Sequence, residues 1–443
     1  MNTHVLWVLV HSLAVLVFVN RYIAGLVLRT WRGRNWDQVR PAHDTWEPTV
    51  TAVIPMYNEG AAIKETLQSL LDADYPAHKL RVVCVDDCSN DDSYEQARSV
   101  ARGSGGRLKI LRNRVNLGKR RSINRAVRET DSEIIVSVDS DVVVDPDAIK
   151  QLMRRFTHDR IAAVGGWIDV RNKHDNWLTR MQTVKYWYAY YFMKNLEWGF
   201  RRIMCLSGCL TAYRRSVLVE LEPVLENRSM FGVPIKYGED RFLTRQIVKA
   251  GWNTTMTLDA RCRTFVPTTL MSYFAQQLRW RRSNIVDYFG GFTHIWRLNP
   301  VLAIHFFSLF ALLIVYPIAL VRALESHRFL PSLQLHLELV VAFGLYYRWR
   351  VRKFPKHERV GALAFFPLTL LMPITYALLT PLALFTLDSG SWETRGHEVP
   401  ATAGGTVEPI ADAATGQHVL VPAAAQVLGA EPVRARARSE VAA

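Results

Sequence analysis

The chain has 443 residues, of which 49% are hydrophobic, and a formal net charge of +15. This length exceeds one ordinary domain, and the apolar residues gather near the N-terminus and beyond residue 298, which argues against a uniformly water-soluble protein. Many arginines flank the apolar segments, as in the cytoplasmic loops of membrane proteins, and no nucleic-acid-binding motif occurs, so nucleic acid is not an expected partner.

Residues 1–30 are predicted to form an N-terminal transmembrane helix. The stretch 5–19 is apolar except for His11 and Ser12, and the preceding residues carry no Lys or Arg. A signal peptide would have a basic start and a small-residue cleavage site, so a retained anchor is expected. Arginines at 29, 32 and 34 then predict that the following chain is cytoplasmic.

Residues 48–285 alternate short β-branched runs with amphipathic stretches. Strands are expected at 49–59, 80–87, 108–113 and 133–141, and helices at 61–71, 91–101 and 119–129. This alternation predicts a parallel sheet covered on both faces. Ligands of such sheets bind beyond the carboxyl ends of the strands. Those ends carry polar side chains at one expected edge: Tyr57, Asn58, Glu59, Asp86, Asp87, Asp139 and Asp141.

Asp139 and Asp141 are one residue apart at the end of a buried strand. Their hard oxygen ligands suit Mg²⁺ or Mn²⁺, which would neutralise a departing diphosphate. The alternative is that Asp139 and Asp141 lie in a solvated turn without a ligand. Asp86 and Asp87 at the end of another strand favour the metal-binding interpretation. Five cysteines, an odd number without matching His or Cys spacing, predict free thiols rather than disulfides or zinc ligands.

Two further motifs begin helices. NLGKRR, residues 116–121, puts Lys119 at a helix start where it could meet phosphate oxygens, although a surface basic cluster is the alternative. GEDR, residues 238–241, puts Glu239 and Asp240 where a carboxylate could deprotonate an acceptor hydroxyl, or could cap the helix. The aromatic stretch 167–191 fits either a packed core or a platform on which sugar rings stack.

The C-terminal part is predicted to be membrane-embedded. An interfacial helix is expected at 286–298 and a spanning helix at 299–321; 332–347 is a shorter apolar run, and 348–359 is basic. Residues 360–387 are apolar but contain Pro367, Pro373 and Pro381. These belong to a transmembrane or re-entrant channel region at 299–390. Residues 397–443 lack apolar periodicity and are predicted to be disordered.

VDDCS, DSD, SGCLTAYRR, GEDR, QQLRWRRS and SWETR occur in this order between residues 50 and 395. Together they resemble the membrane-bound processive glycosyltransferases of family 2, above all hyaluronan synthases and rhizobial chitin-oligosaccharide synthases. The resemblance implies a GT-A fold with a Rossmann-like mixed sheet and an inverting transfer from a UDP-sugar that depends on Mg²⁺ or Mn²⁺.

The resemblance also implies roles for individual residues. Asp240 would be the general base, with Glu239 beside it, and Asp141 the metal ligand. The nucleotide would be held by Tyr57, Glu59, Asp86, Asp87, Lys119, Asp139, Trp392, Thr394 and Arg395. The acceptor end and pyrophosphate would be held by Cys209, Gln276, Gln277, Arg279 and Trp280. Two departures bear on this: Glu393 replaces a glycine in the nucleotide-closing element 391–396, and Cys209 stands where hyaluronan synthases often have proline.

One geometric conflict concerns the C-terminal region. If 299–321 leaves the cytoplasm and 332–347 returns, a third crossing by 360–387 would put Trp392 outside, away from the nucleotide. The three prolines allow a broken, re-entrant segment instead, which we predict. A simple crossing is the alternative.

The leading hypothesis is a multi-pass enzyme of the plasma membrane with a cytoplasmic catalytic domain. It would polymerise a β-linked, N-acetylglucosamine-containing polysaccharide and translocate the growing chain across the lipid membrane. Hyaluronan, made from UDP-GlcNAc and UDP-glucuronate, is the leading candidate product. The alternatives are a chitin or chitin-oligosaccharide synthase using UDP-GlcNAc alone, and a non-processive enzyme acting on a lipid carrier. A transporter or receptor with a degenerate nucleotide-binding domain is disfavoured by the intact acids.

Overall fold

The structure is a computed structural model that describes most of the chain up to residue 388. The described residues are 3–18, then 23, 24, 26, 27 and 30, and 46–388 without 198–201, 231, 236, 293–294, 299 and 328. The closing element 391–396, with Trp392, Thr394 and Arg395, lies outside the described residues, as does the tail 397–443.

An eight-stranded mixed sheet has the order β3-β2-β1-β4-β7-β6-β10-β5. Its strands are β1 (Val50–Met56), β2 (Leu80–Asp86), β3 (Leu108–Arg112), β4 (Ile134–Ser137), β5 (Val142–Val144), β6 (Ile161–Val170), β7 (Thr211–Arg214) and β10 (Asn253–Thr264). The first four strands are mutually parallel, as the alternating pattern predicted. β7 is antiparallel to β4 and β6, and β5 to β10, which makes the sheet mixed.

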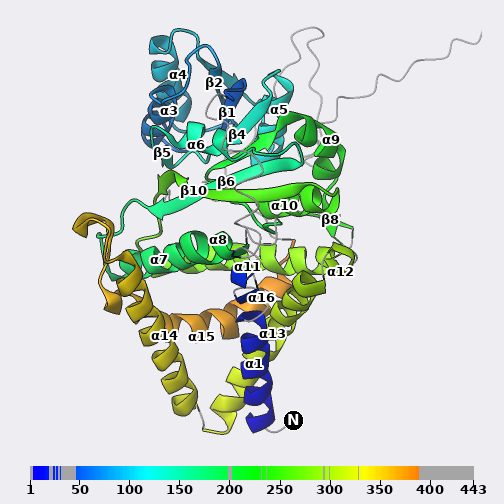
Figure 1. Cartoon of the computed structure of the whole chain (residues 1–443), viewed down its shortest axis with the longest axis vertical. Helices are drawn as coiled ribbons and strands as arrows, with labels where there is room; N and C mark the ends of the chain where they lie inside the picture. The colour runs from blue at the N-terminus through cyan, green and yellow to red at the C-terminus, as the bar shows by residue number, and fades with distance from the viewer. Residues whose placement is uncertain are drawn as a thin grey trace, which may run out of the picture. The chain divides into compact units, whose positions relative to one another are not determined.

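Helices cover both faces of this sheet, because its central strands are apolar on both sides. Every residue of β1 is buried; Ile54 and Met56 pack with one helical layer and Val53 with the other. The first layer holds α3 (Ala62–Leu71), α4 (Ser93–Gly103) and α6 (Ala148–Arg154), and the second α5 (Lys119–Arg128), α9 (Arg215–Glu226) and α10 (Glu239–Lys249). We call the sheet with these six helices the sheet domain (Figure 1).

A second group of helices lies below the sheet domain in Figure 1. It begins with α7 (Trp177–Tyr186), which continues as the π-helix η2 (Trp187–Lys194), and with α11 (Leu270–Gly291). Asn176 starts α7 by accepting hydrogen bonds from the backbone N–H groups of Leu178 and Thr179. In the aromatic stretch, Trp187 and Tyr188 are buried against later helices, so the core interpretation holds for these two rings.

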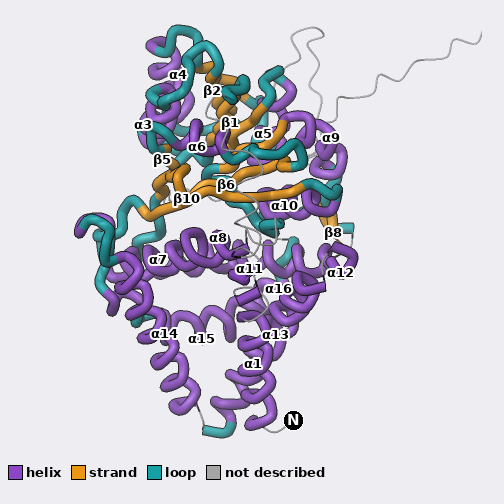
Figure 2. The backbone as a smooth tube through the Cα atoms, in the orientation of Figure 1, coloured by secondary structure: helices purple, strands orange, loops and turns teal. Residues whose placement is uncertain are grey.

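The remaining helices, purple in the lower part of Figure 2, are predominantly apolar in sequence. They are α1 (Thr3–Phe18), α13 (Pro300–Glu325), α14 (Phe329–Val351), α15 (Leu368–Ile374) and α16 (Thr380–Phe385), with the π-helix η6 (Thr375–Leu379) between the last two. Among the described residues, Phe306–Glu325 and Leu368–Phe385 are long and apolar enough to cross a membrane. α1 packs on α13 through Leu6 and Val10, which meet Tyr316 and Leu320.

Short elements connect these parts. They are α8 (Asn195–Glu197), β8 (Ser229–Met230), β9 (Val233–Pro234), α12 (Ile295–Leu298) and the 3₁₀ turns η4 (Lys356–Glu358) and η5 (Ala362–Phe365). The apolar segment 360–387 is therefore not one straight helix. It starts with η5, and α15 then runs across the space between α14 and α13 in Figure 1.

The residue Glu358 just before this segment contacts β10, and Leu387 at its end contacts the loop before α10. Glu358 pairs with Arg261 of β10 at 3.0 Å. The carbonyl of Leu387 accepts a hydrogen bond of 2.7 Å from the Tyr237 hydroxyl. The segment thus leaves the sheet domain and returns to the loop before α10.

Candidate active site

The carboxyl ends of β1, β2 and β4 lie at one edge of the sheet, since these strands are parallel neighbours. Glu59, which follows β1, accepts a 2.7 Å hydrogen bond from the hydroxyl of Ser140, which stands between Asp139 and Asp141. The loops after β1 and β4 are thereby joined. Glu59, Asp139 and Asp141 therefore lie at the same edge of the sheet, as predicted from the sequence.

Lys119 is the first residue of α5 and lies among acids. Its Nζ is 2.5 Å from Asp139 Oδ1 and 3.0 Å from Glu239 Oε1. Burial alone would discharge the ammonium, but Asp139, Glu239 and Asp240 raise the pKa of Lys119 well above its usual value. Burial likewise opposes the charge on Glu239, yet Lys119 lowers the pKa of that carboxyl. Lys119 is therefore a permanent cation held by three acids.

Asp240 lies in the first turn of α10. Its Oδ2 accepts a 3.3 Å hydrogen bond from the backbone N–H of Gly208, and its Oδ1 accepts one of 2.8 Å from that of Arg241. Lys119, Gly208, Glu239 and Asp240 line a common small cavity of about 30 Å³. The N-cap of α10 is Gly238, and no side chain caps this helix, so the helix-cap alternative for Glu239 and Asp240 is wrong; the general-base role of Asp240 stays a prediction.

Two glycines make this close packing possible. A Cβ on Gly208 would lie 2.7 Å from Lys119 Nζ and 3.3 Å from Asp139 Oδ1. Gly238 has φ +68°, and a Cβ there would lie 2.0 Å from the hydroxyl oxygen of Ser283 in α11. Side chains at these positions would displace the charged groups or separate α10 from α11.

Asp139 and Asp141 each have a further partner that sequence spacing did not indicate. The buried thiol of Cys209 lies 3.3 Å from Asp139 Oδ2, and the hydroxyl of Thr264 in β10 donates to Asp141 Oδ2 at 3.0 Å. All five cysteines are free, as predicted. No cluster of three or more His, Cys, Asp or Glu groups suited to a metal occurs in the described part of the chain.

Asp86 and Asp87 are fully buried and organise the loop that leads to Lys119. Asp87 accepts hydrogen bonds from the Asn113 amide at 2.6 Å and from the backbone N–H groups of Leu117 and Gly118 at 2.9 and 2.7 Å. Asp86 pairs with Arg112 Nε at 3.0 Å. These acids thus hold the start of α5 in place, and direct contact with a nucleotide stays a prediction.

Four of the five predicted acceptor residues, Gln276, Gln277, Arg279 and Trp280, lie on α11, whereas Cys209 precedes β7 and contacts Asp139. Gln277 Oε1 accepts a 2.6 Å hydrogen bond from Lys185, and its amide donates to Gln276 Oε1 at 3.4 Å. The buried Nε2 of Gln276 has no hydrogen-bond partner among the described residues, which leaves a donor available to a ligand. Trp280 packs 6.3 Å from Tyr186 between ring centroids.

A buried ion pair fixes α11 to α10. Asp287 of α11 lies 2.6 Å from Arg245 Nε and 3.9 Å from Arg241 of α10. Because Asp240 and Trp280 belong to these two helices, their relative placement depends on this contact.

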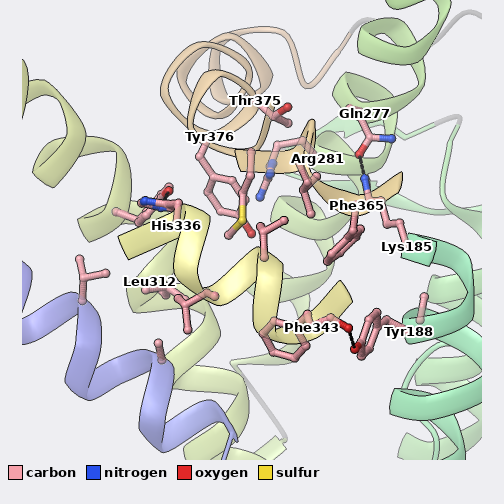
Figure 3. A pocket seen from close by; sticks show the side chains of 18 of the residues that line it. Lys185, Tyr188, Gln277, Arg281, Leu312, His336, Phe343, Phe365, Thr375 and Tyr376 are labelled. Carbon is pink, nitrogen blue, oxygen red and sulfur yellow. Dashed lines mark hydrogen bonds between the residues drawn. The ribbon is translucent and has the colours of Figure 1, made fainter. Parts of the chain in front are cut away.

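A cavity of about 570 Å³ opens beside Trp280 and Gln277 (Figure 3). Its lining comes from α1, α7, η2, α11, α13, α14 and the 360–387 segment. Trp280 and Gln277 were predicted from sequence, whereas Lys185 and Arg281, which also line it, were not. Arg281 stands within the QQLRWRRS motif, and Lys185 lies within the aromatic stretch 167–191, in a segment, DNWLTRMQTVKYW, that resembles the same region of hyaluronan synthases; neither residue was predicted as a site residue.

Comparisons with known proteins agree with this geometry. A profile described as "Glycosyl transferase family 2" matches residues 51–221. An N-acetylglucosaminyltransferase of Rhizobium meliloti is 32% identical over 82% of this chain and 85% of its own. The hyaluronan synthase of Streptococcus pyogenes is 30% identical over 66% of this chain and 70% of its own.

Among solved structures, a mannosyltransferase from Pyrobaculum calidifontis, in complex with GDP-mannose and Mn²⁺, covers 85% of this chain and 96% of its own at 19% identity, with a TM-score of 0.50. This likeness concerns the fold and agrees with a GT-A-like glycosyltransferase fold with a mixed sheet. The family profile and the extended match to the rhizobial enzyme show that this chain is a family 2 glycosyltransferase, a relative of the rhizobial N-acetylglucosaminyltransferases and the hyaluronan synthases.

Proposed function

We propose that this enzyme extends a β-linked, N-acetylglucosamine-containing polysaccharide from UDP-sugar donors at the cytoplasmic face of the plasma membrane and passes the chain across. One observation carries the proposal: the acid cluster around Lys119 on α5 and α10 is fixed, through Asp287, to the helix whose Trp280 lines the large cavity. A transfer centre next to a roomy, aromatic-lined cavity suits an enzyme that retains its product.

In the proposed reaction, the carboxylate of Asp240 takes the proton of the acceptor hydroxyl. The acceptor oxygen then bonds to the anomeric carbon of the donor as the bond from that carbon to the phosphate oxygen breaks, with inversion, and UDP leaves. Lys119 would offset the charge of the diphosphate, and Asp139 would hold the ribose. Glu239 keeps Lys119 oriented at 3.0 Å.

Among the described residues no cluster of three protein ligands is present, so the protein would offer Mg²⁺ or Mn²⁺ a single carboxylate, that of Asp141, which is a hard oxygen ligand. Asp141 would hold the ion, with the remaining positions filled by diphosphate and water oxygens. Bound there, a divalent ion supplies charge neutralisation for the leaving group.

Membrane insertion would use α1, α13, α14 and the 360–387 segment. Many large apolar side chains of α13 and α15 are exposed, among them Ile314, Ile318 and Leu370, and lipid would cover them. The proposed path of 360–387 is re-entrant, supported by the contacts of Glu358 with β10 and of Leu387 with the loop before α10. The closing element 391–396 would then start on the cytoplasmic side.

Membranes bearing the protein, supplied with UDP-GlcNAc and UDP-glucuronate singly and together, test the proposal. We expect UDP release and polymer, with Asp240→Asn reducing both by at least about a hundredfold. Asp131→Asn, an exposed carboxylate outside the site, is the control. Unchanged UDP release in Asp240→Asn would refute the assignment of the base.

A second candidate product is a chitin oligosaccharide, favoured by the 32% identity to the Rhizobium meliloti enzyme across most of both chains. Polymer from UDP-GlcNAc alone would establish that product. Polymer that requires both donors and is degraded by hyaluronidase would establish hyaluronan.

A further inference from the structure

The lining of the 570 Å³ cavity beside Trp280 contains basic side chains but no acidic side chain among the described residues. Lys185 and Arg281 line it, with His11 and His336 farther along, and none of the described lining residues is Asp or Glu. Most of the remaining lining is apolar or aromatic. A cavity of this size that is lined by a lysine and an arginine, and by no acid among the described residues, is an unusual environment for basic side chains.

Lys185 is held by neutral groups alone. Its ammonium donates to Gln277 Oε1 at 2.6 Å and to the Tyr273 hydroxyl at 3.3 Å (Figure 3 shows the contact with Gln277). It also lies 5.2 Å from the ring centroid of Tyr273 and 5.8 Å from that of Trp280. Within the described ranges, no carboxylate comes within 4.0 Å of it. Burial, reinforced by the nearby Arg281, lowers the pKa of Lys185 to about 7.

Arg281 is in the same situation one helical turn after Gln277. Its side chain is buried, and its guanidinium carbon lies 3.8 Å from the ring centroid of Tyr376 in η6. Within the part of the chain that is described, it has no ion pair with an acid. In Figure 3 its guanidinium is seen beside the Tyr376 ring.

The neighbouring arginines show that this is not a general property of the helices. Arg245 and Arg241 are paired with Asp287 on α11, and Lys119 with Asp139 and Glu239. At these three cations an acid supplies the counter-charge. Without an acid among the described lining residues, the empty cavity leaves Arg281 without a counter-charge and disfavours the charged form of Lys185, and an anionic occupant would stabilise both charges.

We propose that Lys185 and Arg281 form a subsite that reads the carboxylates of a uronate-bearing saccharide as it enters the cavity. The subsite rests on the proposed function, because its ligand is the growing product. Trp280 and Tyr376 offer aromatic faces to the sugar rings, and the two cations would pair with carboxylate groups along the chain. A neutral chitin chain would leave both cations uncompensated, so the cavity favours a polymer made with a uronate donor.

The test is binding of labelled oligosaccharides to the full-length protein in nanodiscs without donors, so that no transfer occurs. Two ligands are compared: an octasaccharide that alternates glucuronate and N-acetylglucosamine, and the same octasaccharide with its carboxylates reduced to hydroxymethyl groups. We expect the acidic ligand to bind at least about tenfold more tightly than the reduced one. Lys185→Gln and Arg281→Gln should each remove most of that difference.

Arg180→Gln is the matched control, since Arg180 is an exposed cation on the same helix as Lys185 and does not line the cavity. It should leave both affinities unchanged. Equal binding of the two ligands by the unmodified protein would overturn the subsite. So would variants that weaken both ligands equally, because that outcome indicates a structural role through Gln277.

An anionic lipid that copurifies in the cavity and is lost in Lys185→Gln, as seen by native mass spectrometry, would also overturn the subsite.

Failure of the subsite and failure of the proposed function are separable. Polymer from UDP-GlcNAc alone, with no preference between the octasaccharides, refutes only the subsite. Absence of UDP release with any donor refutes the proposed function whatever the binding ratio.

Discussion

Gly208 shows how little space separates the charged groups of the active site. Its missing side chain allows the backbone N–H to reach Asp240 while Lys119 contacts Asp139. In Gly208→Ala the new Cβ would stand 2.7 Å from Lys119 Nζ. We expect displacement of Lys119 and a donor KM raised about ten- to hundredfold, since overpacking costs roughly 1–3 kcal/mol. UDP-release kinetics measure this, and Gly103→Ala, whose Cβ meets nothing within 4 Å, should match the parent.

The lowered pKa of Lys185 makes stability depend on pH. Because this pKa is about 7 in the folded protein and 10.5 for an ordinary lysine, the unfolded chain binds more protons between these values. The contribution of Lys185 to stability therefore rises as the pH goes from about 7 to about 10.5. Lys185→Met should raise the apparent Tm more at pH 6.5 than at pH 9.5, measured without oligosaccharide. An equal shift at both pH values would contradict the assignment.

At the scale of elements, the contact between α10 and α11 depends on one carboxylate. Asp287 is buried, and burial raises its pKa despite Arg241 and Arg245. Asp287→Asn leaves these arginines without their counter-charge, and we expect destabilisation by about 3–5 kcal/mol with a loss of UDP release. The surface pair Lys109–Glu129, at a similar 2.7 Å, provides the control. Glu129→Gln should leave the apparent Tm unchanged, because solvent screens that pair.

At the scale of the whole molecule, the contacts at the two ends of 360–387 predict that both ends lie on the cytoplasmic side of the membrane. Asp388→Cys should react with an impermeant thiol reagent only after the membrane is opened, whereas Ser326→Cys, in the exposed turn between α13 and α14, should react from outside. The parent protein supplies the background from its own cysteines. Outside labelling at both positions would establish a simple crossing instead.

Sequence patterns predicted those parts of the site that follow from local rules. Parallel strands bring their carboxyl ends together, which located Glu59, Asp139 and Asp141, and the helix start located Lys119. Hydrogen-bond partners of these acids that come from distant elements could not be predicted from local sequence patterns. The hydroxyl of Thr264, in a strand more than a hundred residues later, donates a hydrogen bond to Asp141. The side-chain amide of Asn113 donates one to Asp87.

Helix length shows the same limit. The apolar run 332–347 was expected to be short, but α14 extends to Phe329–Val351. The helix continues through Arg348 and Arg350 because backbone hydrogen bonding does not require apolar side chains, while the sequence estimate ended where hydropathy ended. Likewise, the aromatic stretch around Lys185 did not single out this residue, since its contact with Gln277 arises only where α7 meets α11.

The two anchored ends of the 360–387 segment have a mechanical consequence. Arg261 and Tyr237 hold it at opposite ends, so it cannot swing away from the cavity as a hinged flap does. Within its helical part, Leu368–Phe385, the turn Thr375–Leu379 is π-helical and carries Tyr376 against Arg281. We expect widening of the cavity to deform this turn first, because a π-helical turn interrupts the regular α-helical hydrogen bonding.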